Sequence, residues 1–477
     1  MLFSSIPFIL YFFPIVLLVY YALFFSRPLQ NVWLLISSLA FYAYGEPFYV
    51  LLMIASILIN SFLAIFIEKT KKKKIKKILL IFSVIFNIGQ LFIFKYLSFI
   101  LSFFGEEGEQ LAARLNISLP IGISFFTFQA LSYVIDVYRE VAKADNPFYV
   151  GLYISFFPQL IAGPIVQFNN ISDQLRNRKS TIDKFSLGVC RFVVGFGKKL
   201  FLANGFAAIA DKVFNWSVIG TEKLAVPASL AWLGSIAYML QIYYDFSAYS
   251  DMAIGLGLCF GFKFKENFNY PYVATSISDF WKRWHISLTD WFREYVYFPL
   301  GGNRNKNKDE VVRNLAVVWL LTGIWHGANW TFIFWGMFFF AFQFAERFFS
   351  FEDAVTNKFI KRIYTLLVVN FLWVLFRSDD IYQAGRFILN MFAINDNGIF
   401  SDTAFMLLRE NWLIFILGIV FCMPVVPKMN AWFYANEKSG RHMMYSIIYP
   451  VMMAIMFIVC LSYLIIGSYN PFIYFNF

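Results

Sequence analysis

The sequence predicts an all-α polytopic membrane protein with about ten to thirteen membrane helices, some of them short, re-entrant or interfacial. Of its 477 residues, 60% are hydrophobic and only 14% are charged, and the mean hydropathy is +0.62. Soluble proteins carry charges at roughly a quarter of their positions. A helix crosses the hydrocarbon core with about 20 apolar residues, and apolar runs recur at 5–25, 31–44, 48–67, 78–103, 147–166, 187–210, 226–260, 314–348, 360–376, 411–425 and 443–467.

The first apolar run shows no cleavable leader, because Met1–Phe25 has neither a basic start nor a small-residue cleavage site. We expect it to remain in the membrane as an anchor. The densest basic run, Lys69–Lys77, separates two apolar runs and fits a cytoplasmic loop under the positive-inside rule. That placement puts the amino terminus and the acidic stretch Gly105–Glu109 outside, and it explains the net charge of +11 without a nucleic-acid partner.

The chain has no polar linker and no internal repeat, so we expect one membrane domain over residues 1–477 with a carboxyl-terminal tail at 468–477. A charged and aromatic tract, Asn267–Lys308, interrupts the apolar runs. Within it, Ser278–Tyr297 has the spacing of an amphipathic helix at the membrane surface or packed under it. Its apolar face comprises Trp281, Trp284, Leu288, Trp291 and Tyr295.

The cysteines offer no metal site or disulfide framework, because all four lie in apolar stretches and none are closely paired: Cys190, Cys259, Cys422 and Cys460. The chain also lacks a Gly-rich phosphate loop, a serine nucleophile elbow and a His–Glu metal signature. We therefore expect no metal and no bound cofactor. A histidine acting as general base on a hydroxyl remains, which suits acyl transfer from an activated donor.

His326 is the sharpest candidate for that base. It lies in an apolar run, where a titratable residue is costly and usually faces a cavity. On a continuous helix, Thr322, His326 and Asn329 would share one face, and Gly323 and Gly327 would let a backbone or a substrate approach it. A hydrogen bond from His326 across two helices explains the same residues equally well.

The other two histidines and the two carboxylates of one apolar run are weaker candidates. The spacing of His285 beside the tryptophan face favours packing, and His442 receives no role. Asp245 and Asp251 could relay protons or line a substrate path. Pairing with arginine or capping of a broken helix is at least as good an explanation for these two carboxylates.

Five motifs follow one another along most of the chain. They are FFPQLIAGPI at 156–165, YYDFSAYSDMAIG at 243–255, DFWKRWHISL at 279–288, PLGGNR at 299–304 and GIWHGA at 323–328. The ordered set closely resembles the bacterial membrane-bound O-acyltransferase (MBOAT) family, especially its alginate O-acetyltransferase and teichoic-acid D-alanyl transfer members. Ala248 stands where the family often has glycine.

The resemblance implies a ring of helices around a central tunnel, where a donor bound inside meets an acceptor arriving from outside. It implies that His326 is the essential catalytic histidine and His285 the second histidine of the site, in place of the packing role. The implied donor is a cytoplasmic thioester, either acetyl-CoA or an acyl carrier protein. Candidates for lining the tunnel are Asp245, Asp251, Asn303, Thr322 and Asn329.

The final residues, PFIYFNF at 471–477, resemble the terminal Phe-x-Tyr-x-x-Phe motif of envelope acylation systems. The resemblance implies that Tyr474 relays the acyl group to an extracellular SGNH-hydrolase-like acyltransferase with a serine nucleophile. This requires the carboxyl terminus to reach the outer side of a bacterial cytoplasmic membrane. An aromatic belt at the membrane surface is the alternative, in a chain with 62 phenylalanines and 27 tyrosines.

Two other functions are compatible with parts of the sequence. A transporter or flippase for envelope precursors would explain many spans and intramembrane carboxylates, but no inverted repeat is visible. A lipid or protein O-acyltransferase of the same superfamily would keep the chemistry and change the acceptor. The alginate-like motif set favours an envelope polysaccharide, teichoic acid or peptidoglycan as acceptor.

Overall fold

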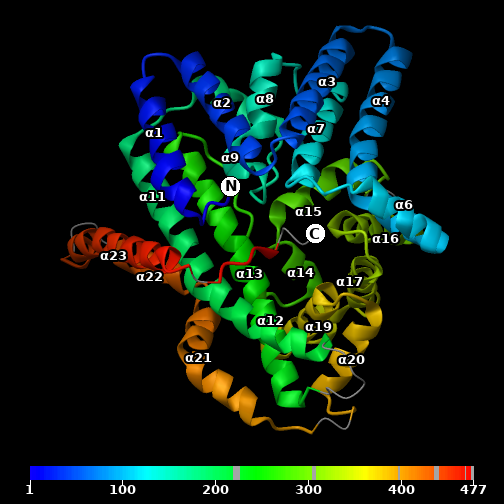
Figure 1. The fold of residues 1–477 in the computed structure, drawn as a ribbon, viewed down its shortest axis with the longest axis vertical. Coiled ribbons are helices and arrows are strands. Elements are labelled where there is room, and N and C mark those ends of the chain that lie inside the picture. The colour runs from blue at the N-terminus through cyan, green and yellow to red at the C-terminus, as the bar shows by residue number, and fades with distance from the viewer. Residues whose placement is uncertain (219–225, 303–307, 396–397, 435–439, 468, 474–477) are drawn as a thin grey trace. The chain divides into compact units, whose positions relative to one another are not determined.

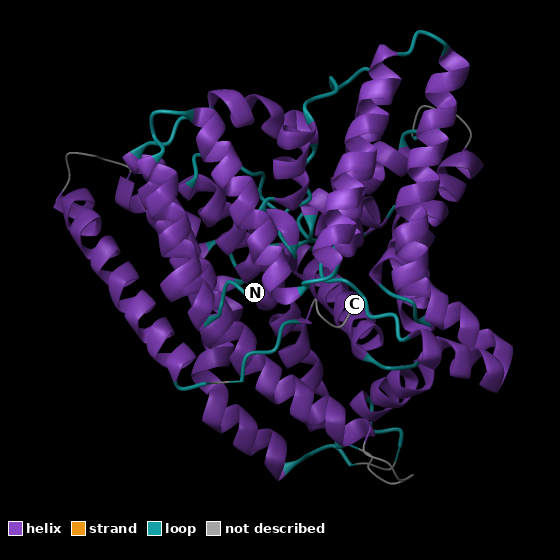
Figure 2. Ribbon diagram, turned by 45° about the horizontal axis from the view of Figure 1, so that its top comes forward, coloured by secondary structure: helices purple, strands orange, loops and turns teal. Residues whose placement is uncertain are grey.

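The computed structural model describes residues 1–218, 226–302, 308–395, 398–434, 440–467 and 469–473. Throughout these residues the elements are helices joined by loops, without a strand (Figure 2). The predicted all-α class is confirmed. The chain divides into two compact units, which are described separately: unit 1 comprises residues 1–192 and 249–266, and unit 2 comprises residues 193–248 and 267–477. The single domain over 1–477 stays a prediction.

Six helical segments of the described chain are long and apolar enough to cross a membrane, namely Tyr49–Lys69, Lys73–Leu115, Ile182–Trp216, Lys358–Arg377, Asp402–Phe421 and Met444–Ile465. Two shorter apolar segments are Pro7–Ala22 and Ile123–Tyr138. Other apolar runs fold as short helices. The run at 147–166, for example, breaks into α8 (Pro147–Ser155) and α9 (Phe157–Leu160), where Pro158 stands in the first turn of α9.

Unit 1 is a bundle in which α3 packs against α4, α7 and α8 (Figure 1). Its buried residues are mostly apolar, and its buried polar residues include Asn60 and Asn87, which hydrogen-bond to each other between α3 and α4 at 2.7 Å. The elements that lie wholly in unit 1 are η1 (Pro7–Phe12), α1 (Phe13–Ala22), α2 (Arg27–Gly45), α3 (Tyr49–Lys69), α4 (Lys73–Leu91), η2 (Phe92–Tyr96), α5 (Leu97–Leu101), η3 (Ser102–Phe104), α6 (Gly105–Leu115), α7 (Ile123–Tyr138), α8, α9 and α10 (Phe168–Asn177).

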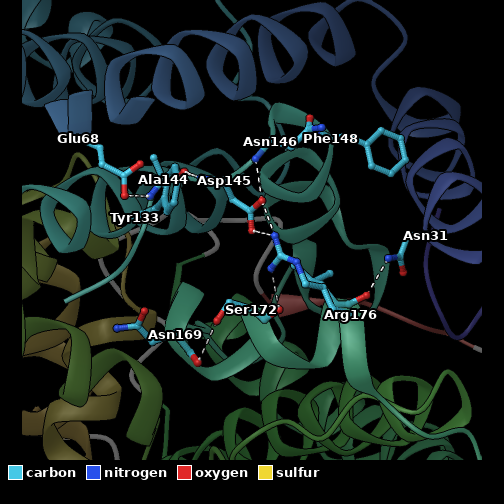
Figure 3. Close-up of polar contacts among 11 residues, drawn as sticks. Asn31, Glu68, Tyr133, Ala144, Asp145, Asn146, Phe148, Asn169, Ser172 and Arg176 are labelled. Atoms are coloured by element: carbon cyan, nitrogen blue, oxygen red, sulfur yellow. Dashed lines mark hydrogen bonds and ion pairs between the residues drawn. The ribbon is translucent and has the colours of Figure 1, made fainter. Parts of the chain in front are cut away.

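The loop from α7 to α8 is held by polar contacts at one end of unit 1 (Figure 3). Asp145 accepts two hydrogen bonds from the Arg176 guanidinium on α10, at 2.6 and 2.7 Å. Its backbone N–H donates to the Tyr133 hydroxyl on α7 at 2.9 Å. The neighbouring Ala144 N–H donates to Glu68 near the end of α3 at 3.2 Å. These contacts tie three helices of unit 1 to one loop.

Unit 2 contains a tight pair of helices, α16 (Lys308–His326) and α17 (Trp330–Phe348), and both candidate histidines. Two further helices are shared with unit 1 along the chain: α11 (Ile182–Gly197) and α13 (Ala228–Cys259), of which residues 193–197 and 228–248 belong to unit 2. Its other elements are η4 (Lys198–Ala203), α12 (Asn204–Val218), η5 (Pro271–Val273), α14 (Ile277–Trp281), α15 (Ile286–Phe292), η6 (Arg293–Tyr297), α18 (Phe351–Ala354), α19 (Lys358–Arg377), α20 (Ile381–Met391), α21 (Asp402–Phe421), α22 (Val425–Tyr434) and α23 (Gly440–Ile465).

Candidate active site

The predicted continuous helix over 278–297 is wrong, because α14 ends at Trp281 and α15 begins only at Ile286. The chain at Asn267–Asn269 forms hydrogen bonds with backbone groups at the break between α14 and α15. The Asn267 carbonyl accepts from Ile286 N–H at 2.9 Å, and the Arg283 carbonyl accepts from Asn269 N–H at 2.9 Å. These non-local bonds replace the helical ones that periodicity alone would predict.

The predicted apolar face is nevertheless correct as a set of buried residues. All five of its members are buried in unit 2: Trp281, Trp284, Leu288, Trp291 and Tyr295. The start of α14 is anchored by Glu346 of α17, whose carboxylate accepts from the N–H groups of Ile277 at 2.6 Å and Ser278 at 3.3 Å. A carboxylate there satisfies backbone donors that a helix leaves open at its first turn. These bonds hold the start of α14, the helix that precedes the break, against α17.

His285 stands in the break with a left-handed backbone, at φ +42° and ψ +54°. This conformation costs a residue with a Cβ free energy, and such strain clusters at functional sites. Its side chain is buried, with 1% of the residue exposed. The ring of Phe246 from α13 packs against the imidazole with centroids 4.5 Å apart.

Asn267 fixes the tautomer of His285. The Asn267 side-chain oxygen accepts from the backbone N–H of Ser287 at 3.2 Å, and an N–H can only donate, so this amide atom is the oxygen. The same oxygen lies 3.2 Å from His285 Nδ1. Nδ1 therefore carries the hydrogen, and Nε2 keeps its lone pair.

The environment of His285 also favours the neutral imidazole. Burial lowers the pKa of His285 to about 3. The side chain is thus uncharged at neutral pH, because desolvation disfavours the imidazolium. A neutral ring with Nε2 unprotonated can accept a hydrogen bond from a substrate hydroxyl.

His326 is the last residue of α16, which corrects the predicted helical stripe. Thr322 does lie one turn earlier on α16, where its hydroxyl donates to the Val318 carbonyl at 2.7 Å. Asn329 lies beyond the helix end, as the N-cap of α17, accepting from Thr331 N–H at 3.0 Å and donating to the Asp379 carbonyl at 2.7 Å. Residues 327–329 are not helical and connect α16 to α17, so Asn329 does not share the face of His326.

An aromatic enclosure surrounds the buried His326 ring. Its centroid lies 4.8 Å from that of Trp335, 5.0 Å from that of Trp325 and 5.2 Å from that of Phe376, each at a steep interplanar angle. Trp325 also contacts His285, with centroids 6.3 Å apart. One indole therefore touches both histidines, so the fold brings together the two residues that the sequence singled out.

The position of His326 at the carboxyl end of α16 is compatible with a role as a general base. As the terminal residue of α16, it lies at the negative end of the helix dipole, which stabilises an imidazolium once a proton has been taken up. The enclosing aromatic rings exclude water, which strengthens electrostatic interactions inside. The pair thus offers one histidine held neutral and one placed where a positive charge is supported.

The two carboxylates of the YYDFSAYSDMAIG motif are each engaged in an ion pair. Asp245 lies in unit 2, 2.6 Å from Lys199 Nζ. Asp251 lies in unit 1, 2.6 Å from Arg191, which also contacts Glu266 at 2.6 Å. The alternative of pairing with a basic residue therefore describes both, with lysine in place of arginine for Asp245.

Two predicted residues, Asn303 and Tyr474, lie outside the described residues. Three others were not singled out by the sequence: Asn267, Trp325 and Lys199. A lysine inside the apolar run 187–210 was a signal that could have found Lys199. Asn267 gave no such signal, because its role depends on a hydrogen bond to a residue 18 positions away.

The described residues contain no group of three or more His, Cys, Asp or Glu side chains that could hold a metal ion. The candidate site consists instead of imidazole, indole and amide groups. Groups of these kinds can transfer protons and form hydrogen bonds to a hydroxyl or a developing oxyanion.

Several apolar helices long enough to span a membrane and a buried pair of histidines are the features of a multi-pass membrane protein with a candidate site inside it. Residues 123–378 match the family described as MBOAT, membrane-bound O-acyltransferase family. The chain belongs to this family and is an O-acyltransferase. The resemblance drawn from the five motifs is confirmed, and the transporter alternative is set aside.

Two relatives that cover most of the chain, and one that covers about half of it, agree with this assignment. The chain is 40% identical over 401 residues to the probable alginate O-acetylase AlgI of Pseudomonas aeruginosa, covering 82% of this chain and 75% of that protein. It is 36% identical over 433 residues to the peptidoglycan O-acetyltransferase of Helicobacter pylori, covering 83% and 80%. It is 29% identical over 237 residues to the teichoic acid D-alanyltransferase of Bacillus subtilis, covering 47% and 58%.

Proposed function

We propose that this protein moves an acyl group, acetyl in the first instance, from a cytoplasmic thioester across the membrane for O-acylation of a cell-envelope polysaccharide or peptidoglycan. The relatives named for alginate and peptidoglycan O-acetylation support this acceptor class. The observation that carries the proposal is the histidine pair, in which His285 and His326 contact the same indole, Trp325.

In the proposed first step, the Tyr474 hydroxyl oxygen attacks the thioester carbonyl carbon while His326 takes the hydroxyl proton. The single hydroxyl hydrogen is donated to His326, and the neutral His285, which contacts the same indole as His326, helps to fix the position of that base. The tetrahedral intermediate collapses as the carbon–sulfur bond breaks, and His326 returns the proton to the leaving thiolate. The products are an acyl ester of Tyr474 and a free thiol, either CoA or the thiol of an acyl carrier protein.

In the proposed second step, the acyl group passes from Tyr474 to a serine of an exported SGNH-hydrolase-like partner, which delivers it to the polymer. The serine oxygen attacks the acyl carbon, the bond from that carbon to the tyrosine oxygen breaks, and Tyr474 takes up the serine proton, so the tyrosine acts as a covalent relay. This step requires Tyr474 at the outer face of the bacterial cytoplasmic membrane. The net basic charge of +11 would help to attract an acidic thioester donor at the inner face.

The function is tested by the ester content of the envelope. Cells lacking the endogenous protein would be complemented with the intact chain, His326→Ala, His285→Ala or the control His442→Ala, at matched membrane levels. O-acetyl groups released from purified polysaccharide and peptidoglycan would be quantified. We expect a loss of about 100-fold or more for His326→Ala, since removing a general base costs about that much, and no loss for His442→Ala. Full acetylation with His326→Ala would refute the assignment of the base.

A further inference from the structure

The segment Tyr469–Ile473 follows α23 and enters the interior of unit 2. Tyr469 is 56% exposed, whereas Phe472 and Ile473 are 6% and 7% exposed. Figure 1 shows this segment in red, leaving α23 and reaching α13. Non-helical main chain among membrane helices needs partners for its polar groups, because no water is available to satisfy them.

Lys199 and Asp245 supply those partners. The side chains form an ion pair of 2.6 Å and are each only 3% exposed. The Lys199 ammonium also donates to the carbonyl of Pro471, and Asp245 Oδ2 accepts from the backbone N–H of Ile473 at 2.9 Å. One ion pair thus binds an acceptor and a donor that lie two residues apart on the same short segment.

Fold stability alone does not explain this pair. Removing two charges from water costs several kcal/mol per ion, and apolar replacements of buried pairs are often neutral or stabilising. The contacts to the main chain of 471–473 are what an apolar pair could not provide. Lys199 also lies in a π-helical turn, η4, and such turns are frequent at functional sites.

The position of the pair relates it to the candidate site. Asp245 precedes Phe246 on α13, and the Phe246 ring packs against His285 with centroids 4.5 Å apart. The segment is therefore held next to the turn of α13 that contacts His285. The residue that follows the held segment is Tyr474.

We propose that Lys199 and Asp245 are positioning residues that hold Pro471–Ile473 in a fixed register and so present Tyr474 for acylation. Docking of Pro471–Ile473 by the ion pair is independent of any activity. Presentation of Tyr474 for acylation rests on the proposed function. Separate experiments measure docking and presentation.

Docking is measured with the full chain in nanodiscs carrying Phe472→Cys, a buried position, as a thiol probe for a maleimide. The signal of the same protein without the added cysteine is subtracted, because the chain has four cysteines of its own. In Lys199→Met/Asp245→Leu we expect the probe to react about tenfold faster or more, as local opening exposes the segment. The thermal unfolding midpoint should change little. A folded double variant whose probe stays protected would overturn the docking claim.

A second double variant keeps the test decisive if the first does not fold. Lys199→Met/Asp245→Asn removes both charges but retains an oxygen that can accept from Ile473 N–H. We expect protection intermediate between the intact chain and Lys199→Met/Asp245→Leu. The control is Tyr469→Phe, which removes the 2.8 Å hydrogen bond from the exposed Tyr469 hydroxyl to Asp211 and should leave the probe protected.

Presentation is measured in the same variants without the probe, as acyl label on Tyr474 from a radiolabelled acetyl thioester. We expect label to fall about tenfold or more wherever protection is lost and to persist in Tyr469→Phe. Loss of protection with unchanged label would overturn the positioning role. An intact chain that never takes label would refute the relay and this presentation role together, while maleimide reactivity would still decide whether the ion pair docks the segment.

Discussion

Asn267 holds two residues through one oxygen atom. That oxygen accepts from Ser287, through both its N–H at 3.2 Å and its hydroxyl at 2.9 Å, and from His285 Nδ1 at 3.2 Å. The arrangement sets the imidazole tautomer and stabilises a strained backbone in the same place. At this scale the sequence identified the histidines by their unusual surroundings. It could not identify Asn267, whose role arises only when the chain folds back on itself.

Replacing Asn267 by alanine tests the tautomer. We expect the rate of acyl transfer to fall about tenfold or more, because Nδ1 loses its acceptor and the ring can rotate. Stability should fall by roughly 1–3 kcal/mol, since buried donors are left unsatisfied. The matched control is Ser287→Ala, which removes another bond to the same oxygen at 2.9 Å without touching the imidazole. Equal rate losses in the two variants would contradict the tautomer role.

The pH dependence of stability tests the burial of His285. Burial lowers its pKa to about 3, from an ordinary value of 6.5. Between these values the unfolded state binds a proton that the folded state refuses, so stability is lost as pH falls below about 6.5. Thermal unfolding midpoints at pH 7.5, 6 and 5 should drop less for His285→Gln than for the intact chain. His442→Gln should follow the intact chain, and an unchanged slope in His285→Gln would show that His285 is not held neutral.

The α16–α17 pair determines where His326 lies. Two glycines allow these helices to meet closely: a Cβ on Gly323 would lie 2.5 Å from the Phe332 carbonyl oxygen, and one on Gly336 would lie 2.4 Å from that of Trp319. The apolar run at 314–348 and its glycines were visible in the sequence. The end of α16 at His326 was not, because periodicity carried the helix on to Asn329. Helix ends depend on the turn that the neighbouring helix requires.

Gly323→Ala tests this packing. The added methyl group meets backbone rather than a flexible side chain, so the helices must separate. We expect a destabilisation of about 1–3 kcal/mol and a loss of transfer activity, because His326 lies one turn away on the same helix. Gly385→Ala on α20 is the control, since a Cβ there would meet nothing within 4 Å. Thermal unfolding of both variants measures the difference, and similar midpoints would mean that close approach is unimportant.

The fold class and the family of the whole chain could be predicted from its sequence. The number of helices long enough to cross a membrane was harder to predict. Hydropathy predicted about ten to thirteen membrane helices, whereas six helical segments of the described residues are long and apolar enough to span. Runs such as 147–166 fold as shorter helices, because burial inside the protein makes a segment apolar as effectively as lipid does. The orientation of the chain in the membrane stays a prediction drawn from the lysine run at 69–77.

Single cysteines introduced into a cysteine-free background test that orientation in intact cells. Lys72→Cys should react with a membrane-impermeant maleimide only after permeabilisation, because the positive-inside rule places it in the cytoplasm. Glu107→Cys and Ser468→Cys should react from outside if the amino-terminal topology and the outward tail are both correct. The reverse pattern would place Tyr474 on the wrong side for an extracellular partner.

The proposed relay is tested most simply by the chemical state of Tyr474. The purified intact chain would be incubated with radiolabelled acetyl-CoA or acetylated acyl carrier protein, beside His326→Ala, Tyr474→Phe and His442→Ala, and the labelled peptides identified by mass spectrometry. We predict an acetyl ester on Tyr474 in the intact chain and in His442→Ala, and none in the other two. Equal label in His326→Ala, or label that survives Tyr474→Phe, would contradict a histidine-dependent tyrosine relay.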